Sequence, residues 1–282
     1  MNDIKTIGVI GAGQMGTGIT EVSILAGYKT LIFDSNPKAV LNTVEKISEN
    51  LNKQNTKNKI TIEQKEKALA KIATPSSLND FKNCDLVIDA VIENFTTKID
   101  IFEQIQDIVS DEAIIASNTS SISITKMAGQ LKNPANFIGI HFMNPVPVMS
   151  LVEIIKGLQT SEKAYNLAKK YAESLNKTTI LAIDSAGFII NRILCPMLNE
   201  AIFLLQEGVS KEDIDKGMKL GTNQPMGPLE LADFVGLDTL LFIMQTLHNE
   251  LGEDKYRPCP LLIKYVEAGW LGRKAKRGFY EY

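Results

Sequence analysis

A glycine-rich segment near the N-terminus constrains the fold of this chain more than any other feature. The segment GAGQMG (11–16) follows the apolar, β-branched run IKTIGVI (4–10), and a stretch with helical apolar spacing comes after it. A strand, a glycine turn and a helix in this order are typical of a dinucleotide-binding fold. Gly11 permits the tight turn, Gly13 lets the backbone approach a pyrophosphate, and Gly16 lets helix and strand pack closely. The N–H groups at the helix N-terminus then face the phosphates.

An acidic residue at the end of the second predicted strand indicates which dinucleotide binds. Asp34 closes the run TLIFD (30–34), 18 residues beyond Gly16, where a carboxylate accepts hydrogen bonds from the adenosine ribose. That carboxylate would repel a 2′-phosphate, and residues 35–37 include no arginine to attract one. We therefore predict NAD rather than NADP. The simpler alternative is a strand–helix junction that carries an acid by chance.

Strand and helix patterns alternate through the first two thirds of the chain. Further strands are predicted at 30–34, 84–93, 113–117, 137–142, 150–155 and 178–183, and helices at 37–70 (a solvated pair), 98–109 and 162–175. This alternation predicts an α/β fold with a doubly wound, parallel sheet of the Rossmann type. The short Pro-rich bend between FIGIHF (137–142) and SLVEII (150–155) departs from it and predicts an antiparallel pair at one edge of the sheet.

The pattern changes after Asp184, beyond which no strand is predicted. Helical apolar spacing runs through 191–208, and Ser210 is the predicted N-cap of the next helix. A further helix, predicted over 229–247 with Pro228 in its first turn, is apolar nearly all round, so it is either central or at a subunit contact. We therefore predict a Rossmann domain at 1–184 and a helical domain at 185–282.

Composition excludes several classes of function. A net charge of −3 gives no electrostatic reason to expect a nucleic-acid partner. The longest apolar region, 234–247, carries Asp238 and is predicted to be a buried helix, so no membrane association is expected. Three scattered cysteines and two histidines make a zinc site improbable, and no metal is predicted. A reducing compartment, the cytoplasm, fits this cysteine usage best.

The segment HFMNPVPVMSLVEI (141–154) joins one of these two histidines to an isolated carboxylate. If the two strands pair about the bend, His141 and Glu153 lie close to opposite each other, because both are symmetric about residue 147. A carboxylate among apolar neighbours is costly unless it is paired, and an imidazole held by one gains a fixed tautomer. Such a pair suits general acid/base chemistry beside a nicotinamide. A satisfied core histidine and an edge carboxylate facing water are the simpler alternatives.

Two polar segments could complete such a site. SNTSSIS (117–123) follows a strand and supplies hydroxyl groups, and GFIINR (187–192) places Asn191 at the start of a helix. From the residues alone, helix capping and surface charge are the favoured interpretations of both.

Six segments spread over nearly the whole chain carry a resemblance to one family. They are GVIGAGQMGTGI (8–19), ASNTSSISIT (116–125), IGIHFMNPVPVMSLVEII (138–155), GFIINRILCPMLNEA (187–201), KLGTNQPMGPLELAD (219–233) and RGFYEY (277–282). Together they resemble the L-3-hydroxyacyl-CoA dehydrogenases, and most closely the short bacterial 3-hydroxybutyryl-CoA dehydrogenases. The third segment is the most specific of the six.

The resemblance implies a role for each matching residue. His141 would be the general acid/base, Glu153 its partner, and Ser120 and Asn191 the residues at the reacting centre of a short acyl-CoA substrate. The implied cofactor-binding residues are Gly11, Gly13, Gly16 and Asp34 at the adenosine and pyrophosphate, and Glu93, Lys98, Asn144 and Lys274 nearer the nicotinamide. The implied reaction is the NAD-dependent interconversion of 3-hydroxybutyryl-CoA and acetoacetyl-CoA, and the helical domain would form a homodimer.

Two departures from the family pattern stand out. The tail carries Lys276 where the family usually has glycine, which puts the pose of the tail in question. The helical insert NLNKQNTKNKI (50–60) is unusually rich in asparagine. In that insert Lys53 and Lys57 are candidate partners for the phosphates of coenzyme A, although a solvated lysine face is the commoner explanation of such a run.

Two other functions fit parts of the sequence. One is a dehydrogenase of a sugar acid or other hydroxy acid without coenzyme A, but relatives of that kind place a lysine base where this chain offers Asn191. The other is a cofactor-binding protein without turnover, a role that would not need His141, Glu153, Ser120 and Asn191 together.

Overall fold

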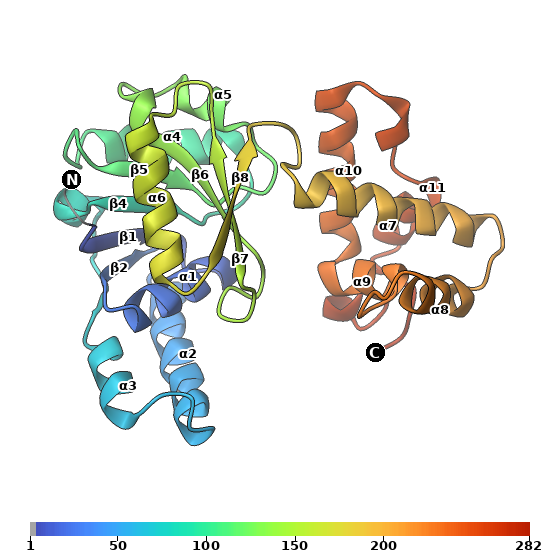
Figure 1. The fold of residues 1–282 in the computed structure, drawn as a ribbon, viewed down its shortest axis with the longest axis horizontal. Coiled ribbons are helices and arrows are strands. Elements are labelled where there is room, and N and C mark those ends of the chain that lie inside the picture. The colour runs from blue at the N-terminus through green and yellow to red at the C-terminus, as the bar shows by residue number, and fades with distance from the viewer. Residues whose placement is uncertain (1–3) are drawn as a thin grey trace. The chain divides into compact units, whose positions relative to one another are not determined.

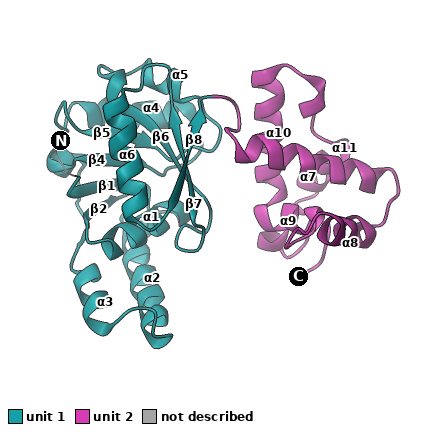
Figure 2. Ribbon diagram, in the orientation of Figure 1, with its two compact units in different colours: residues 1–184 teal, residues 185–282 magenta. Residues whose placement is uncertain are grey.

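The computed structural model describes residues 4–282. The chain forms two compact units, Met1–Asp184 and Ser185–Tyr282 (Figure 2). The first unit is built on a sheet with helices packed against it, and the second is helical (Figure 1). No helix within residues 4–282 combines the length and apolar character needed to cross a membrane.

The first unit contains one eight-stranded sheet with the order β3-β2-β1-β4-β5-β6-β7-β8. Its strands are β1 (Thr6–Ile10), β2 (Lys29–Phe33), β3 (Ile72–Ala73), β4 (Leu86–Asp89), β5 (Ile114–Ser117), β6 (Phe137–Phe142), β7 (Leu151–Lys156) and β8 (Thr178–Ile183). Every pair of neighbours is parallel except β6 and β7. The predicted doubly wound α/β class is therefore confirmed, with β3 as a short strand that the sequence pattern did not indicate.

Six α-helices lie in the described part of the first unit, residues 4–184. They are α1 (Gln14–Leu25), α2 (Pro37–Thr56), α3 (Ile62–Leu69), α4 (Phe95–Gln106), α5 (Ile124–Ala128) and α6 (Glu162–Ser174). Most begin at a side chain that accepts a backbone N–H, such as Asn36 before α2 and Thr61 before α3. The predicted solvated pair, α2 and α3, is anchored to α1 by a small apolar cluster of Ile24, Ile47 and Leu51.

The antiparallel pair is interior to the sheet, so its predicted place at the edge is wrong. β7 forms parallel pairs with β8 along Leu151–Lys156, and β8 is the edge strand. After α6 the chain returns beside β7, so β8 pairs with the second edge of the β7 backbone, while Val152 and Ile154 on the face of β7 are buried in one cluster with Ala168 and Tyr171 of α6.

The strand order reverses between β1 and β4, which makes this the switch point of the sheet. In such sheets ligands bind outside the carboxyl ends of the strands at the switch point. Gly11 follows β1, and Asp89 and Ser117 are the last residues of β4 and β5. The same edge therefore gathers the glycine turn and several polar side chains.

The second unit consists of five helices and short connecting turns. The helices are α7 (Ile190–Gln206), α8 (Lys211–Gly221), α9 (Pro228–Val235), α10 (Leu237–Leu251) and α11 (Pro260–Glu267). They enclose a separate apolar core that includes Leu198, Leu229 and Met244. Ser210 caps α8 as predicted, since its hydroxyl accepts the N–H of Asp213.

The single helix predicted over 229–247 is wrong, because the structure contains two helices there. Gly236 separates α9 from α10 with φ 100° and ψ 124°, a conformation that L-residues with a side chain rarely adopt. An apolar pattern on both sides of the break gave no sign of it, since both helices bury apolar faces in the same core.

The C-terminal tail is held by a buried carboxylate. Asp233, 1% exposed, accepts the N–H groups of Phe279 and Tyr280 at 2.9 Å each and the hydroxyl of Tyr282 at 3.1 Å. Lys276 takes φ 58°, the left-handed conformation that explains why glycine is usual at this position. The tail therefore has a defined pose in spite of the lysine.

The break at Gly236 predicts the sign of a substitution. A helix interior gains about 1 kcal/mol when Gly is replaced by Ala, so a continuous helix would be stabilised by Gly236→Ala. We expect that variant instead to be less stable by at least about 1 kcal/mol, because φ 100° strains an L-residue. The measurement is the thermal unfolding temperature.

The matched control is Gly217→Ala within α8. No heavy atom lies within 4 Å of a Cβ built there, and its φ is not positive, so the same change should raise the unfolding temperature. If both variants were stabilised, α9 and α10 would form one continuous helix in solution.

Candidate active site

The glycine turn is shaped to accept a pyrophosphate. Gly11 has φ 107°, and a Cβ on Gly16 would lie 1.7 Å from the carbonyl oxygen of Gly11, so only glycine permits this approach of α1 to β1. Gly13 is the N-cap of α1, and because glycine has no side chain, no side-chain cap hydrogen bond occupies the first N–H groups of the helix. No heavy atom lies within 4 Å of a Cβ built on Gly13. Open space beside the glycine at a helix N-terminus fits the close approach of a dinucleotide's phosphates.

Asp34 lies beside this turn at the end of β2. Its Oδ2 atom accepts the N–H of Ala12 at 2.8 Å, and its Oδ1 atom accepts the N–H of Asn36 at 2.9 Å. The carboxylate is half-buried, and each of its oxygens has a second lone pair that could accept a ribose hydroxyl. The structure thus places Asp34 where a ribose contact is expected, although the contact itself stays a prediction.

His141 and Glu153 face each other across the antiparallel pair. The register of β6 and β7 sets them opposite, and the His141 Nδ1 atom lies 2.7 Å from the Glu153 Oε2 atom. His141 is 7% exposed and Glu153 is fully buried. The predicted cross-strand position is therefore confirmed. A carboxylate in this place selects the tautomer with its proton on Nδ1, which leaves Nε2 as the atom that can exchange a proton.

The backbone beside His141 is tied to the neighbouring strand. Asn118, which follows β5, accepts the N–H of Phe142 through its Oδ1 atom at 2.9 Å. This bond fixes the end of β6 against the segment 117–123, so the histidine and the serine-rich segment are held in one frame. The sequence indicated an amide in this segment but not its contact with β6.

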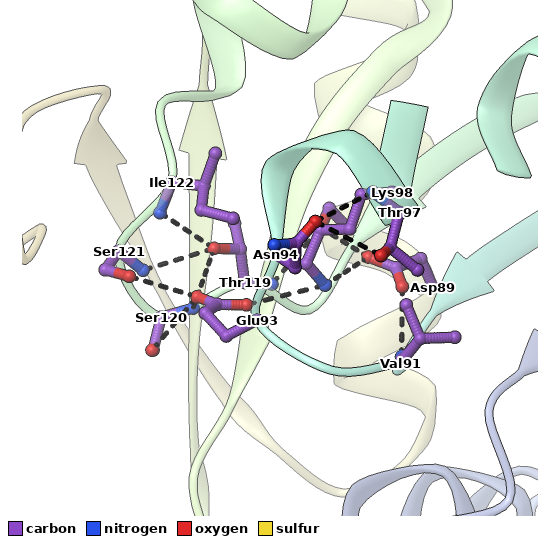
Figure 3. A network of polar contacts seen from close by, with 11 residues as sticks. Asp89, Val91, Glu93, Asn94, Thr97, Lys98, Thr119, Ser120, Ser121 and Ile122 are labelled. Atoms are coloured by element: carbon purple, nitrogen blue, oxygen red, sulfur yellow. Dashed lines mark hydrogen bonds and ion pairs between the residues drawn. The ribbon is translucent and has the colours of Figure 1, made fainter. Parts of the chain in front are cut away.

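Glu93 gathers the serine-rich segment around one oxygen. Its Oε1 atom accepts the Thr119 hydroxyl at 2.6 Å, the Ser121 hydroxyl at 3.1 Å, and both the N–H and the hydroxyl of Ser120, at 2.8 and 3.2 Å (Figure 3). Lys98 lies 3.4 Å from the other oxygen. Glu93, which the resemblance assigns to the cofactor, and Ser120, which it assigns to the substrate, therefore meet in one network.

Glu93 is held in its ionised form. Burial alone would raise the pKa of Glu93, but the charge of Lys98 and the hydrogen bonds from Thr119, Ser120 and Ser121 outweigh it and lower that pKa. An ionised acceptor makes stronger hydrogen bonds than a neutral one. The loop that carries Ser120 is ordered by a carboxylate that stays charged.

A fully buried ion pair between Lys98 and Asp89 lies next to Glu93, and Lys98 contacts both carboxylates. The Lys98 Nζ atom lies 2.6 Å from Asp89 Oδ2, with 1% and 0% of the two side chains exposed (Figure 3). Asp89 also accepts the Ser117 hydroxyl at 2.8 Å and the N–H of Val91 at 3.0 Å. Asp89 was missed in the sequence, although it stands in the apolar strand VIDAVI just as Glu153 stands in LVEII.

The bend between β6 and β7 borders a groove. Asn144 is exposed at the start of this bend. A groove of about 310 Å³ lies between the bend, α1 and α2, and Asn144, Lys46 and Lys53 are among its lining residues. Lys57 is not part of it and lines a separate surface depression with Lys53 and Glu49. Of the two lysines predicted for coenzyme A, Lys53 is therefore the one beside the bend.

Two predicted residues belong to the second unit. Asn191 is near the start of α7, and Lys274 lies in the short 3₁₀ turn η4 (Arg273–Ala275) with its Nζ atom 2.6 Å from the Asp238 carboxylate. Their roles beside the first unit stay predictions.

The cysteines supply no reactive thiolate to this arrangement. Burial raises the pKa of the Cys84 and Cys195 thiols to about 12, and burial also raises the pKa of Cys259. Thiols of this kind stay protonated and unreactive. Among the described residues, 4–282, no group of three or more His, Cys, Asp and Glu side chains is placed to hold a metal ion.

The buried pair predicts a large loss of stability when one partner is removed. We expect Lys98→Met to lower the free energy of unfolding by about 3–5 kcal/mol, because it leaves the Asp89 carboxylate buried without its counter-ion. Denaturant unfolding followed by circular dichroism measures this change.

The matched control is Lys67→Met. Lys67 forms a pair with Glu63 at the same 2.6 Å, but both side chains are 75% exposed, and such pairs contribute little. Equal losses in the two variants would show that the burial of Asp89 and Lys98 carries no special cost.

Comparison with known proteins identifies the family. Residues 6–185 match the NAD binding domain of 3-hydroxyacyl-CoA dehydrogenase, and residues 187–282 match the C-terminal domain of that family. The chain is 52% identical over 280 residues to a 3-hydroxybutyryl-CoA dehydrogenase of Bradyrhizobium diazoefficiens, which covers 99% of this chain and 96% of the relative. It is 48% identical over 281 residues to a probable 3-hydroxybutyryl-CoA dehydrogenase of Bacillus subtilis, covering 99% and 98%.

Solved structures agree with this assignment. (S)-3-hydroxybutyryl-CoA dehydrogenase PaaH1 from Ralstonia eutropha matches with a TM-score of 0.97 at 47% identity, covering 99% of both chains. FadB2 of M. tuberculosis matches with a TM-score of 0.97 at 41% identity, covering 100% of both chains. The chain belongs to the 3-hydroxyacyl-CoA dehydrogenase family, and it is an oxidoreductase that binds NAD.

Proposed function

We propose that this enzyme interconverts 3-hydroxybutyryl-CoA and acetoacetyl-CoA, with His141 and Glu153 as its general acid/base pair. The names of the relatives support the substrate. The observation that carries the chemistry is the 2.7 Å contact between the His141 Nδ1 atom and a fully buried carboxylate, on the strand next to the serine-rich segment.

The proton chemistry follows from this contact. The nicotinamide, when bound, supplies or accepts the hydride at C3 of the substrate. As an alcohol loses its hydride it must also lose its hydroxyl proton, and the reverse reaction must protonate the ketone oxygen. His141 exchanges this proton at Nε2, while Glu153 holds the ring and stabilises its cation. A fully buried Glu153 is suited to this task, because solvent does not screen its charge.

Ser120 and Asn191 hold the reacting oxygen of the substrate in this proposal. The four hydrogen bonds onto Glu93 Oε1 hold the Ser120 segment in place, so its hydroxyl is positioned before substrate arrives. Groups held in place in advance cost no reorganisation during the reaction.

The cofactor contacts divide between the two ends of NAD. Gly11, Gly13, Gly16 and Asp34 take the pyrophosphate and the adenosine ribose. Glu93, Lys98, Asn144 and Lys274 serve the nicotinamide half. For Lys98 we propose an indirect part, because its buried ammonium already contacts Asp89 and Glu93. Its charge keeps Glu93 ionised and the Ser120 segment in place.

The two units take different tasks in this proposal. Residues 1–184 bind NAD, while 185–282 bind substrate and form a homodimer. Large apolar side chains exposed on the second unit, including Ile193, Leu220 and Phe234, support a contact with a second copy. Lys53 and, less directly, Lys57 meet the phosphates of coenzyme A. Buried free thiols at Cys84, Cys195 and Cys259 support a reducing compartment such as the cytoplasm.

The first experiment tests substrate and cofactor together. We expect the purified enzyme to consume NADH rapidly with acetoacetyl-CoA and to use NADPH poorly, because the Asp34 carboxylate would repel a 2′-phosphate. Absorbance at the nicotinamide band measures both rates. If the folded protein binds NADH but turns over neither cofactor with acetoacetyl-CoA, the proposed substrate is wrong, and hydroxy acids without coenzyme A are the next substrates to test.

A second experiment tests the acid/base pair. We expect His141→Gln to lower kcat by about two orders of magnitude or more, as loss of a general acid/base does, while NADH still binds. The matched control is His248→Gln, which changes the other histidine of the chain, 37% exposed on α10. Wild-type turnover in His141→Gln would rule out His141 as the acid/base.

A further inference from the structure

The bend between β6 and β7 is short of backbone donors. We define the bend as residues 144–149, NPVPVM. Pro145 and Pro147 have no N–H, so one third of its residues cannot donate a backbone hydrogen bond. Val148 and Met149 donate theirs to the carbonyl of Pro145 at 3.0 Å each, which closes the turn on itself. The carbonyl groups of Val146 and Met149 therefore need hydrogen-bond donors from elsewhere in the chain.

Lys177 supplies those donors. Its Nζ atom donates to the Val146 carbonyl at 2.6 Å and to the Met149 carbonyl at 2.8 Å, and the residue is 9% exposed. The next residue, Thr178, donates its N–H to the carbonyl of Ser150 at 2.7 Å. Lys177 therefore holds the bend through its side chain, and Thr178, the first residue of β8, holds the residue that follows the bend through the backbone.

An ammonium group suits this place better than a neutral donor. It carries three N–H donors and no acceptor, so it can satisfy two carbonyls at once. Burial lowers the pKa of Lys177, which is the cost of taking the charge out of water. Hydrogen bonds from a charged donor are stronger than neutral ones and offset that cost.

The opposite side of the bend is fixed by α1. A Cβ on Gly18 would lie 2.7 Å from the Cβ of Val146, so the bend approaches the helix as closely as only glycine allows. Val146 is 2% exposed and belongs to the main core of the first unit. The bend is therefore clamped between Gly18 and Lys177, with Val146 as the residue common to both contacts.

We propose that Lys177 is a positioning residue whose ammonium holds the bend that joins the strands of His141 and Glu153 in the single shape that presents Asn144 at the groove. The bend begins three residues after His141 and ends four residues before Glu153. Its shape therefore sets the direction in which β6 ends and β7 begins. This inference rests on the proposed function for its catalytic meaning, but its structural part can be tested separately.

The structural test is hydrogen exchange of the bend. The Lys177→Met variant of the full-length protein keeps a long, unbranched side chain and removes the three N–H donors of the ammonium group. We expect the amides of Val148 and Met149 to exchange about fivefold faster or more, as expected when a hydrogen bond that supports them is lost. Exchange measured by mass spectrometry on peptides that cover residues 143–150 reports this directly. Wild-type exchange rates in this variant would overturn the proposal.

The matched control lies at the other end of the same pair of strands. Thr160 is 8% exposed, and its hydroxyl donates to the Phe137 carbonyl at 2.8 Å and accepts the N–H of Gly157 at 3.0 Å. Thr160→Val removes two hydrogen bonds as Lys177→Met does, yet should leave exchange at 143–150 unchanged. If both variants accelerate exchange there equally, Lys177 only adds general stability and the proposal fails. Should Lys177→Met not fold, Lys177→Gln replaces it. Its shorter, uncharged side chain keeps two N–H donors, so exchange at 143–150 should accelerate less than in Lys177→Met but still exceed the wild-type rate, and wild-type exchange would overturn the proposal.

The functional test uses rescue by a small amine. We expect Lys177→Ala to lower kcat/KM for NADH by about tenfold or more, since displacements of about 1 Å near reacting groups can cost more than that. Propylammonium should restore part of the loss. Tetramethylammonium, which has the charge but no N–H, should not. Equal effects of the two cations, or full activity without either, would overturn the proposal.

The outcomes separate this inference from the proposed function. If wild-type enzyme shows no turnover with acetoacetyl-CoA, the proposed substrate is wrong. The rescue of Lys177→Ala by propylammonium is then measured as the affinity for NADH instead of as kcat/KM. Faster exchange in the bend would still establish the role of Lys177 in that case.

Discussion

Charge that is buried at the carboxyl edge of the sheet must be paired, and the candidate site is organised around that requirement. Glu153 and Asp89 are fully buried, and Lys98 is 1% exposed. Each would be costly alone, and each has a partner within 2.7 Å. The pairing leaves few alternative positions for these side chains, so the imidazole of His141 and the segment around Ser120 are fixed as a consequence.

Two sets of contacts connect these buried pairs to the rest of the site. Glu93 links the Asp89–Lys98 pair to the serine-rich segment through four hydrogen bonds on one oxygen (Figure 3). The proline bend links His141 to Glu153 along the chain, and Lys177 from the start of β8 compensates for the N–H groups that the prolines lack. The edge strand carries no proposed reacting group, and the residue just before it, Lys177, is what connects this edge of the sheet to the site.

Sequence reasoning succeeded where one local rule decides the structure, and it failed where several rules compete. The glycine turn, the strand pattern and the opposition of His141 and Glu153 depend on spacing along a short piece of chain. The break at Gly236 could not be read in the same way, because both α9 and α10 face one core and their apolar patterns run together. The place of the β6–β7 pair was misjudged because β8 packs beside it only after α6 has turned the chain back. Asp89 was overlooked although the argument applied to Glu153 would have found it.

The sequence by itself determined the fold class, NAD as the cofactor, the family and the pairing of His141 with Glu153 across the bend. Those features are encoded in glycines, short motifs and a two-residue strand period, which act over a few residues. Only the tertiary structure decided that Lys98 faces Asp89 and Glu93, that Lys53 but not Lys57 borders the groove, and that Lys177 reaches the bend. Each of these depends on which side chains from distant elements share a buried space, and burial with its electrostatic cost exists only once the chain has packed.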